Sequence, residues 1–322
     1  MNKTLLFSSL FNFILILGCQ DEFAFETRDV NYEALGTGKL LISSASNNMN
    51  YYIDVEAKET YLLPLPRRNG GNVTVDAKGQ FAYTHEGKTL YRAVPGEWVW
   101  EEMNVSLPGG SIEEGRIYDL EVDPKSETLY FIWEKPETFN KALIALALST
   151  GEMTDLSEKT GLEISHFSLN PVSGDLLLPI PSSSDDTLYL YLYELDNEQL
   201  SLLFTSAIDW SSWIPFNSVL TWLPNGQEFA MVQSSIPDTI FRYDASTLER
   251  KGMFFRTDSF NEFLSVKFGP KGKSFIFREY ESVSLTQWDT NYARGSSLED
   301  ETLVLLCSYF VCESPNNIYW WP

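Results

Sequence analysis

The sequence contains few of the residues that most often build metal and enzyme sites. Among its 322 residues are two histidines, His85 and His166, and three cysteines. Two histidines are too few for a histidine-rich metal centre, although they do not exclude carboxylate sites. The signature motifs of serine hydrolases, zinc peptidases, P-loop ATPases and dinucleotide-binding enzymes are also absent. We therefore expect no catalytic site, no bound metal and no cofactor, and we expect His85 to be a solvated turn residue.

Basic residues are scarce as well. The 23 lysines and arginines face 45 aspartates and glutamates, which gives a formal net charge of −22. Such a surface repels phosphate backbones, and no basic cluster offsets it. Nucleic acid is therefore excluded as an expected partner.

Long helical periodicity is missing, and apolar residues instead occur in short alternating runs, which predicts an all-β fold. In residues 264–277 an alternating strand runs into a Pro270-Lys271-Gly272 turn, and a second strand follows. Four other segments repeat this unit, and the five equivalent turn positions are Ala77, Pro124, Pro171, Pro224 and Pro270. The intervals between successive positions are 47, 47, 53 and 46 residues. A nearly constant interval of this size indicates one supersecondary unit repeated along the chain.

Each interval also contains a second pair of short strands, such as residues 51–55 and 60–65. Four short antiparallel strands in about 47 residues are typical of a β-propeller blade. The length of the chain predicts six blades, with seven as the alternative, in a single domain over residues 29–322. Residues 309–320 either close the ring against the N-terminal strands or complete the blade that begins at Leu264. In the second case residues 286–301 would be a polar insertion.

The strand–turn–strand units have Pro, Gly and Lys in the turn and an aromatic or aliphatic strand after it. They resemble the repeats of TolB-type β-propellers over roughly residues 38–322. The turns read Pro-Lys-Gly, Pro-Asn-Gly or Pro-Val-Ser-Gly, where that family usually has Pro-Asp-Gly. The resemblance implies a propeller and brings no further functional motif.

The N-terminus predicts export and a lipid anchor. Lys3 precedes a mostly apolar stretch, residues 5–17, which is too short to span a membrane as a helix. Residues 16–19, Ile-Leu-Gly-Cys, resemble a bacterial lipobox, which implies that residues 1–18 are removed and that Cys19 is lipidated. Residues 19–28 would form an acidic tether. Its residues 20–22, Gln-Asp-Glu, resemble the surface-export signal of Bacteroidetes lipoproteins, or they simply start an acidic linker. We expect an outer membrane lipoprotein, at the cell surface or on the periplasmic face.

The other two cysteines, Cys307 and Cys312, lie five residues apart. On one continuous strand they would face opposite sides, roughly 16 Å apart, whereas a disulfide needs Cα atoms about 4.4–6.8 Å apart. We expect two buried free thiols, and a disulfide only if a bend separates them.

Polar residues stand at the start of most of the expected innermost strands. The residues five positions before the turn positions are Asn72, Asp119, His166, Val219 and Ser265. Such a ring at the mouth of the axial channel could bind a small ligand or ion, or it could be polar because water fills the channel. An acid–base pair of Asp119 and His166 is conceivable, but no sequence feature brings the two together.

The longest interval, 53 residues between Pro171 and Pro224, contains an aromatic insertion at residues 208–217. Trp210 and Trp213 lie there, on the loop that enters an innermost strand. Exposed aromatic rings beside Asp and Asn suit a sugar or an apolar patch on a partner protein. The alternative is that both rings pack between blades.

These features favour a lipid-anchored cell-envelope propeller that binds a ligand or protein and has no catalytic site. The expected partners are the membrane, through the lipid, and an envelope protein or glycan. The alternative is a glycan-acting hydrolase or lyase that uses carboxylates on the loop face, because carboxylate pairs leave no linear motif. A third hypothesis is a structural subunit of a surface complex.

Overall fold

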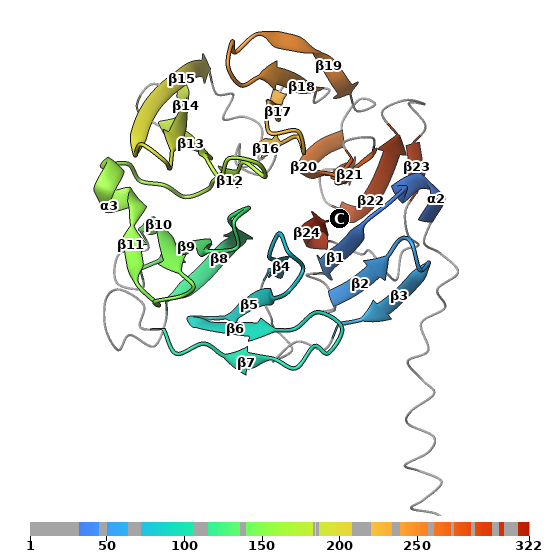
Figure 1. Cartoon of the computed structure of the whole chain (residues 1–322). Helices are drawn as coiled ribbons and strands as arrows, with labels where there is room; N and C mark the ends of the chain where they lie inside the picture. Colours follow the sequence, from blue (N-terminus) through green and yellow to red (C-terminus); the bar gives the residue numbers. More distant parts are fainter. Residues whose placement is uncertain are drawn as a thin grey trace, which may run out of the picture.

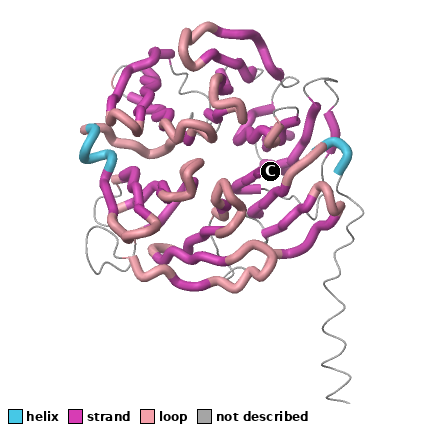
Figure 2. Tube along the Cα trace, viewed as in Figure 1, coloured by secondary structure: helices cyan, strands magenta, loops and turns pink. Residues whose placement is uncertain are grey.

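The computed structural model describes residues 32–44, 50–63, 72–105, 115–135, 140–182, 184, 187–207, 220–233, 239–256, 261–271, 274–284, 287–297, 303–305 and 315–321. Strands dominate these ranges, which also contain two short helices, α2 (Tyr32–Leu35) and α3 (Leu156–Thr160), as Figure 2 shows. Within the same ranges the strands form six four-stranded sheets, and neighbouring strands are antiparallel. The sheets lie around a central axis (Figure 1), so the predicted all-β propeller of four-stranded antiparallel blades is confirmed.

Five of these sheets each take four consecutive strands, with the first strand innermost (Figure 1). The first two are β4 (Thr74–Val75), β5 (Ala82–Glu86), β6 (Thr89–Ala93) and β7 (Glu101–Glu102), then β8 (Arg116–Val122), β9 (Thr128–Glu134), β10 (Lys141–Ala147) and β11 (Met153–Asp155). The third is β12 (Ser168–Leu169), β13 (Leu176–Ser182), β14 (Thr187–Glu194) and β15 (Gln199–Ala207). The last two are β16 (Leu220–Trp222), β17 (Glu228–Gln233), β18 (Thr239–Asp244) and β19 (Arg250–Arg256), then β20 (Asn261–Phe268), β21 (Ser274–Ser284), β22 (Gln287–Ser297) and β23 (Leu303–Leu305).

The remaining sheet joins the two ends of the described chain. Strand β24 (Pro315–Trp321) is followed across the sheet by β1 (Lys39–Ser44), β2 (Asn50–Asp54) and β3 (Glu59–Leu62). Leu40 lies opposite Trp320 in the β1–β24 pair. Of the two alternatives for the C-terminal segment, the structure therefore shows pairing with the N-terminal strands. The polar insertion considered for residues 286–301 is wrong, because residues 287–297 form β22, which pairs with β21.

Adjacent sheets are held together by apolar residues that alternate along the strands. Tyr83 and Leu90, from β5 and β6, pack in one cluster with Ile117, Phe131 and Ile144, from β8, β9 and β10. Phe131 and Ile144 have no exposed surface. Since a lone four-stranded sheet leaves both faces open to water, this burial between sheets explains why the repeats must assemble around an axis.

Three of the turns that follow an innermost strand are fixed by a short polar side chain just before the turn position. Asp76, Asp123 and Asn170 fill this place and are all buried. Asp123 Oδ1 accepts from the backbone amides of Glu127 at 2.6 Å and Thr128 at 2.9 Å. Carboxylate and amide oxygens satisfy turn amides in this way, which explains the Asp or Asn at this place in three repeats. The other two repeats have Leu223 and Gly269 there.

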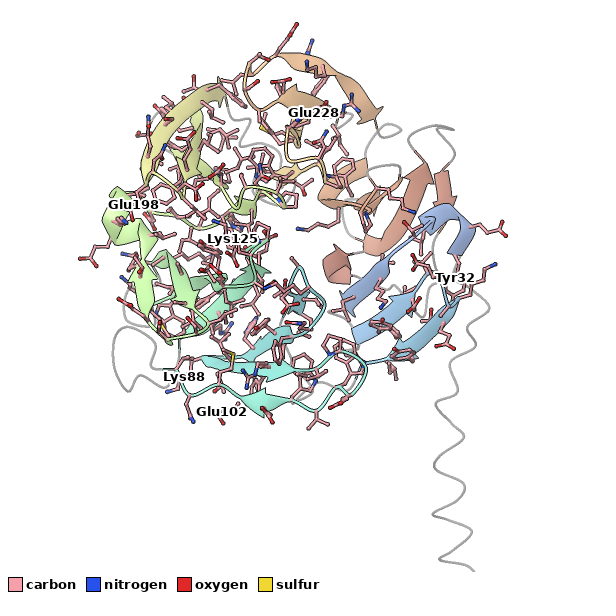
Figure 3. The ribbon with its side chains drawn as sticks, in the orientation of Figure 1. Tyr32, Lys88, Glu102, Lys125, Glu198 and Glu228 are labelled. Carbon is pink, nitrogen blue, oxygen red and sulfur yellow. The ribbon has the colours of Figure 1, made fainter. Side chains whose placement is uncertain are left out.

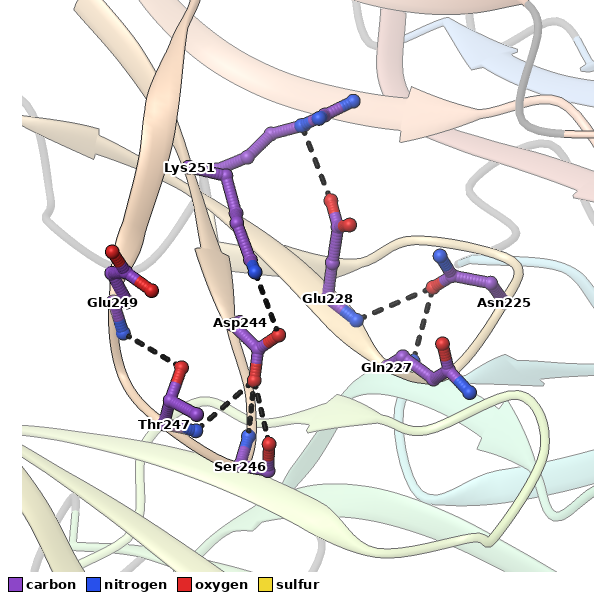
Figure 4. Close-up of polar contacts among 9 residues, drawn as sticks. Asn225, Gln227, Glu228, Asp244, Ser246, Thr247, Glu249 and Lys251 are labelled. Carbon is purple, nitrogen blue, oxygen red and sulfur yellow. Dashed lines mark hydrogen bonds and ion pairs between the residues drawn. The ribbon is translucent and has the colours of Figure 1, made fainter.

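Outer turns use the same device, as the close-up of the β16–β19 sheet shows (Figure 4). Asp244 Oδ1 accepts from the amides of Ser246 and Thr247, each at 3.0 Å, and from the Ser246 hydroxyl at 2.7 Å. The Lys251 ammonium lies 3.2 Å from the other carboxylate oxygen. The Ser246 hydroxyl is the main reason that the pKa of Asp244 is held well below its ordinary value, with Thr247 and Lys251 contributing.

Candidate functional site

A cavity of about 370 Å³ lies at the axis of the ring, at the end where the innermost strands turn. All five turn positions predicted from the repeat line it: Ala77, Pro124, Pro171, Pro224 and Pro270. Lys125, which follows Pro124, lies on the axial side of the ring in Figure 3, whereas Lys88 and Glu102 lie at its outer edge. The regular interval in the sequence therefore places one rim of mostly proline residues around the cavity.

Below this rim the walls are polar in one row and apolar in the next. The residues three positions before the turn are polar, and those lining the cavity are Glu121, Ser168, Thr221 and Lys267. The residues two positions before the turn are apolar and also line the cavity: Val122, Leu169, Trp222 and Phe268. Side chains at adjacent positions of a strand point in different directions. The polar row and the apolar row therefore meet the cavity from different sides of each strand.

An ion pair crosses the cavity. The Lys267 ammonium lies 3.1 Å from Glu121 Oε1, although the two residues belong to β20 and β8. These strands are separated by β12 and β16 on one side of the ring and by β4 and β24 on the other, so they lie on opposite sides of the axis (Figure 1). The side chains of Lys267 and Glu121 are 30% and 20% exposed, so both charges can meet a molecule inside the cavity.

Further hydrogen bonds hold the walls of the cavity in place. Glu121 Oε2 accepts from the backbone amide of Leu169 at 3.0 Å, which ties β8 to β12. The Trp222 indole N–H donates to the Ser168 carbonyl at 3.2 Å, which ties β16 to β12. Three neighbouring innermost strands are thus linked by side chains that also line the cavity.

The structure brings together two of the predicted site residues, Asp119 and His166. Asp119 Oδ2 lies 3.2 Å from His166 Nδ1, and the two side chains are 40% and 25% exposed. Asp119 belongs to β8, where the pairing with β9 shifts between Tyr118 and Glu121. The imidazole faces the Asp119 carboxylate through Nδ1, and Nε2 is its other ring nitrogen, which accepts a hydrogen bond when the proton of the neutral ring is on Nδ1. This arrangement has the form of a general-base pair.

His85 does not lie in a solvated turn, as the sequence suggested, but in β5. Its side chain is partly buried, and Nδ1 is shielded from solvent with no hydrogen-bond partner among the described residues. Burial lowers the pKa of His85 to about 4, with the Gly87 backbone and the Asp119 carboxylate acting in the opposite direction. His85 is therefore neutral at neutral pH, and the prediction failed because nothing in the local sequence shows that β8 covers the end of β5.

The other predicted site residues are not brought into this group. Asn72 lies just before β4, and its carbonyl accepts from the Thr84 hydroxyl at 3.2 Å. Ser265 lies in β20, opposite Arg278 in β21. The remaining predicted residues fall outside the described ranges, namely Trp210, Trp213, Cys19, Cys307 and Cys312.

Sequence reasoning missed the two charged residues of the cavity, Glu121 and Lys267. Counting five residues back from each turn position selected Asp119 and His166, whereas a count of three gives the polar row that contains Glu121 and Lys267. Positions three and five before the turn are two residues apart, so strand alternation would have placed both on one face. Their pairing across the ring has no signal in the local sequence, because 146 residues separate them.

Two searches of the described part of the chain complete the description of the site. No group of three or more His, Cys, Asp and Glu residues in it is arranged to hold a metal ion. No helix in the described ranges is long and apolar enough to cross a membrane.

No protein-family model matches this sequence, and no curated protein matches it either. Among solved structures, the putative TolB from Agrobacterium tumefaciens is similar over 89% of this chain and 99% of its own, with a TM-score of 0.59 and 13% identity. An oligogalacturonate lyase in complex with manganese is similar over 81% of this chain and 71% of its own, with a TM-score of 0.55 and 14% identity. A protein of unknown function from Bacteroides caccae is similar over 88% of this chain and 99% of its own, with a TM-score of 0.53 and 13% identity. These likenesses show a TolB-like β-propeller fold.

Proposed function

We propose that this protein is a lipid-anchored β-propeller of the bacterial cell envelope, of the Bacteroidetes lipoprotein type, and that it acts as a binding module. Its six sheets would be the six blades of a ring closed by β24 and β1. Cys19 would hold it at the outer membrane, on the cell surface or on the periplasmic face. The partner would be an envelope protein or a glycan.

The observation that carries the proposal is the axial cavity. Its volume, about 370 Å³, lies within the range of small-molecule sites, which are roughly 300–1,000 Å³. It combines an apolar rim with a few polar groups on rigid strands, and this combination is typical of binding sites. The TolB-like fold of the structural neighbours supports the same general role.

The binding role is tested by exposing the full chain to envelope glycans and envelope proteins. We expect a stable complex that is weakened by Lys267→Met, which removes one charge from the cavity. Lys88→Met is the matched control, because Lys88 lies at the outer edge of the ring. Equal binding by both variants would place the interaction outside the cavity and contradict the proposal.

The anchor is tested separately by cell fractionation. We expect the native chain in the membrane fraction, and Cys19→Ser in the soluble fraction, because acyl chains on Cys19 would supply the membrane affinity. A Cys19→Ser protein that still partitions into membranes would remove the anchor from the proposal without affecting the cavity.

One observation favours a second candidate, a glycan-acting lyase. The Asp119–His166 pair offers an accessible imidazole nitrogen held by a carboxylate, which is the form of a proton-abstracting base. The likeness in fold to an oligogalacturonate lyase gives this candidate some support. The corresponding hydrolase is less favoured, because Glu121 is the one carboxylate among the described residues that line the cavity.

Incubation with oligogalacturonides distinguishes the two candidates. A lyase would form unsaturated products that absorb in the ultraviolet, and His166→Gln would abolish their formation. His85→Gln serves as the control, because His85 Nδ1 is shielded from solvent. Stable binding without product formation would favour the binding module.

A further inference from the structure

The charges inside the axial cavity restrict what can bind there. Lys267 and Glu121 are its charged lining residues within the described part of the chain, and they neutralise each other at 3.1 Å. Glu121 is held in position by the Leu169 amide, so its carboxylate stays directed into the cavity. An occupant must therefore either leave this ion pair intact or replace it.

We infer that the cavity binds a small zwitterion, an α-amino acid with an apolar side chain, whose two charges replace the Lys267–Glu121 pair. This inference rests on the proposed binding function and names the class of ligand. The ammonium group of the ligand would meet Glu121, and its carboxylate would meet Lys267. Each protein charge then keeps a partner of opposite sign, so neither is left desolvated and unpaired.

Ligands of a single charge do not satisfy this arrangement. A lone carboxylate that pairs with Lys267 would lie beside the displaced Glu121 carboxylate, and like charges at this distance repel each other. A lone amine would meet the same difficulty beside Lys267. The net charge of −22 also disfavours the approach of anions, whereas a zwitterion is neutral overall.

The remaining walls select the rest of the ligand. Val122, Leu169, Trp222 and Phe268 form the apolar row beside the charged pair. The Ser168 and Thr221 residues of the polar row are themselves almost fully buried. An aliphatic or aromatic amino-acid side chain would be covered by the apolar row while its backbone groups replace the ion pair.

The experiment measures binding of three matched probes to the full chain by isothermal titration calorimetry at neutral pH. L-Phenylalanine carries both charges, phenethylamine lacks the carboxylate, and 3-phenylpropionate lacks the amine. We expect L-phenylalanine to bind at least about tenfold more tightly than either analogue, since each analogue leaves one charge of the site unpaired. L-Leucine is included as a second zwitterion with a smaller apolar side chain, so that a poor fit of the phenyl ring is not mistaken for a failure of the charges to bind.

Two variants test the roles of the charges. In Lys267→Met the free Glu121 should favour phenethylamine, and in Glu121→Gln the free Lys267 should favour 3-phenylpropionate. Each variant should lose about tenfold or more in affinity for L-phenylalanine. Glu121→Gln retains an oxygen for the Leu169 amide, and circular dichroism with thermal unfolding checks that both variants are folded.

Three results would overturn the inference: no binding of either amino acid, equal binding of all three matched probes, or amino-acid binding that neither variant changes. Failure here is distinguishable from failure of the proposed function. If a glycan or envelope protein binds and is lost in Lys267→Met while amino acids do not bind, the ligand class alone is wrong. If Lys267→Met and Lys88→Met bind every partner equally, the cavity is not the binding site.

Discussion

Asp119 reaches His166 from a backbone conformation that few residues adopt. Its φ angle is 47°, in the left-handed region, and its carboxylate lies 3.2 Å from the imidazole of the neighbouring blade. Aspartate and asparagine tolerate this region better than other residues with a Cβ atom. The local bulge in β8 and the pairing with His166 therefore depend on the same residue.

We predict that Asp119→Asn leaves the free energy of unfolding nearly unchanged, because asparagine suits the same φ and can accept from His166. Asp119→Ala should lower it by about 1–2 kcal/mol, since alanine fits the left-handed region poorly. Urea denaturation measures both values, and Asp196→Ala, at an exposed ion pair with Lys125, serves as the surface control. Equal stability of the Asn and Ala variants would show that the backbone at position 119 is not strained.

Neutral His85 makes the stability of the protein depend on pH. The pKa of His85 is lowered from 6.5 to about 4 in the folded protein, so between these values the unfolded chain binds more protons. The contribution of His85 is therefore fully present above pH 6.5 and is lost as the pH falls through this window. Because carboxylates titrate in the same pH range, only a comparison of variants isolates the contribution of the His85 imidazole.

We predict that His85→Gln reduces the loss of stability between pH 7.5 and pH 4.5 by on the order of 2 kcal/mol. Thermal unfolding midpoints at both pH values measure the effect. The matched control is His166→Gln, which removes the other histidine and should leave most of the acid sensitivity. A native-like pH dependence in His85→Gln would mean that its imidazole is not buried in the neutral form.

The turns of neighbouring blades are in direct contact at Gly226. The Asn170 side-chain amide donates to the Gly226 carbonyl at 2.9 Å, and a Cβ atom on Gly226 would lie 2.7 Å from Asn170 Oδ1 and 2.8 Å from Val172. Gly226 also has a φ of +64°, where glycine is favoured. Two separate costs therefore oppose any side chain at this position.

Gly226→Ala and Gly79→Ala separate these two costs. Gly79 has nearly the same φ, +65°, and a Cβ atom on it would meet no other atom within 4 Å. We predict a loss of about 1 kcal/mol for Gly79→Ala from the backbone alone. Gly226→Ala should lose a further 1–3 kcal/mol, roughly, from the steric conflict between blades. Equal losses in urea denaturation would show that the turns can move apart without cost.

Gly115 allows the chain to pass close to Trp133. A Cβ atom on Gly115 would collide with the Trp133 indole, which is buried in the cluster between the β4–β7 and β8–β11 sheets. We predict that Gly115→Ala lowers the free energy of unfolding by roughly 2 kcal/mol. Trp133→Phe shortens the ring, so the double variant should lose less than the sum of the two single variants. Strict additivity would indicate that the two residues do not compete for space.

The repeat was predictable because it depends on local chemistry. Proline marks four of the five turns, Asp or Asn marks four of them, and alternation marks the strands, so the turn positions around the cavity could be identified without coordinates. Position 170 illustrates the limit. The Asn-Pro sequence predicts that Asn170 lies in a turn. Its hydrogen bond to Gly226, 56 residues later, depends instead on how neighbouring blades pack against each other.

The candidate site was less predictable, for a related reason. Asp119 and His166 were identified by their equivalent places in the repeat, yet their contact depends on the positive φ of Asp119, which no periodic pattern reports. Lys267 and Glu121 meet only because the ring brings distant blades face to face. Local patterns therefore predicted the strands and turns, whereas the pairing of charges was decided by tertiary geometry.

The pairing of β24 with β1 also has a consequence for the order of events during biogenesis. A chain that is synthesised or threaded from its N-terminus presents β1 long before residues 315–321 appear. Until then one edge of β1 has no partner, and the hydrogen bonds that join the first sheet to the last strand cannot form. Completion of this sheet therefore needs both segments, and a chain cut before residue 315 would leave that edge of β1 without its β24 partner.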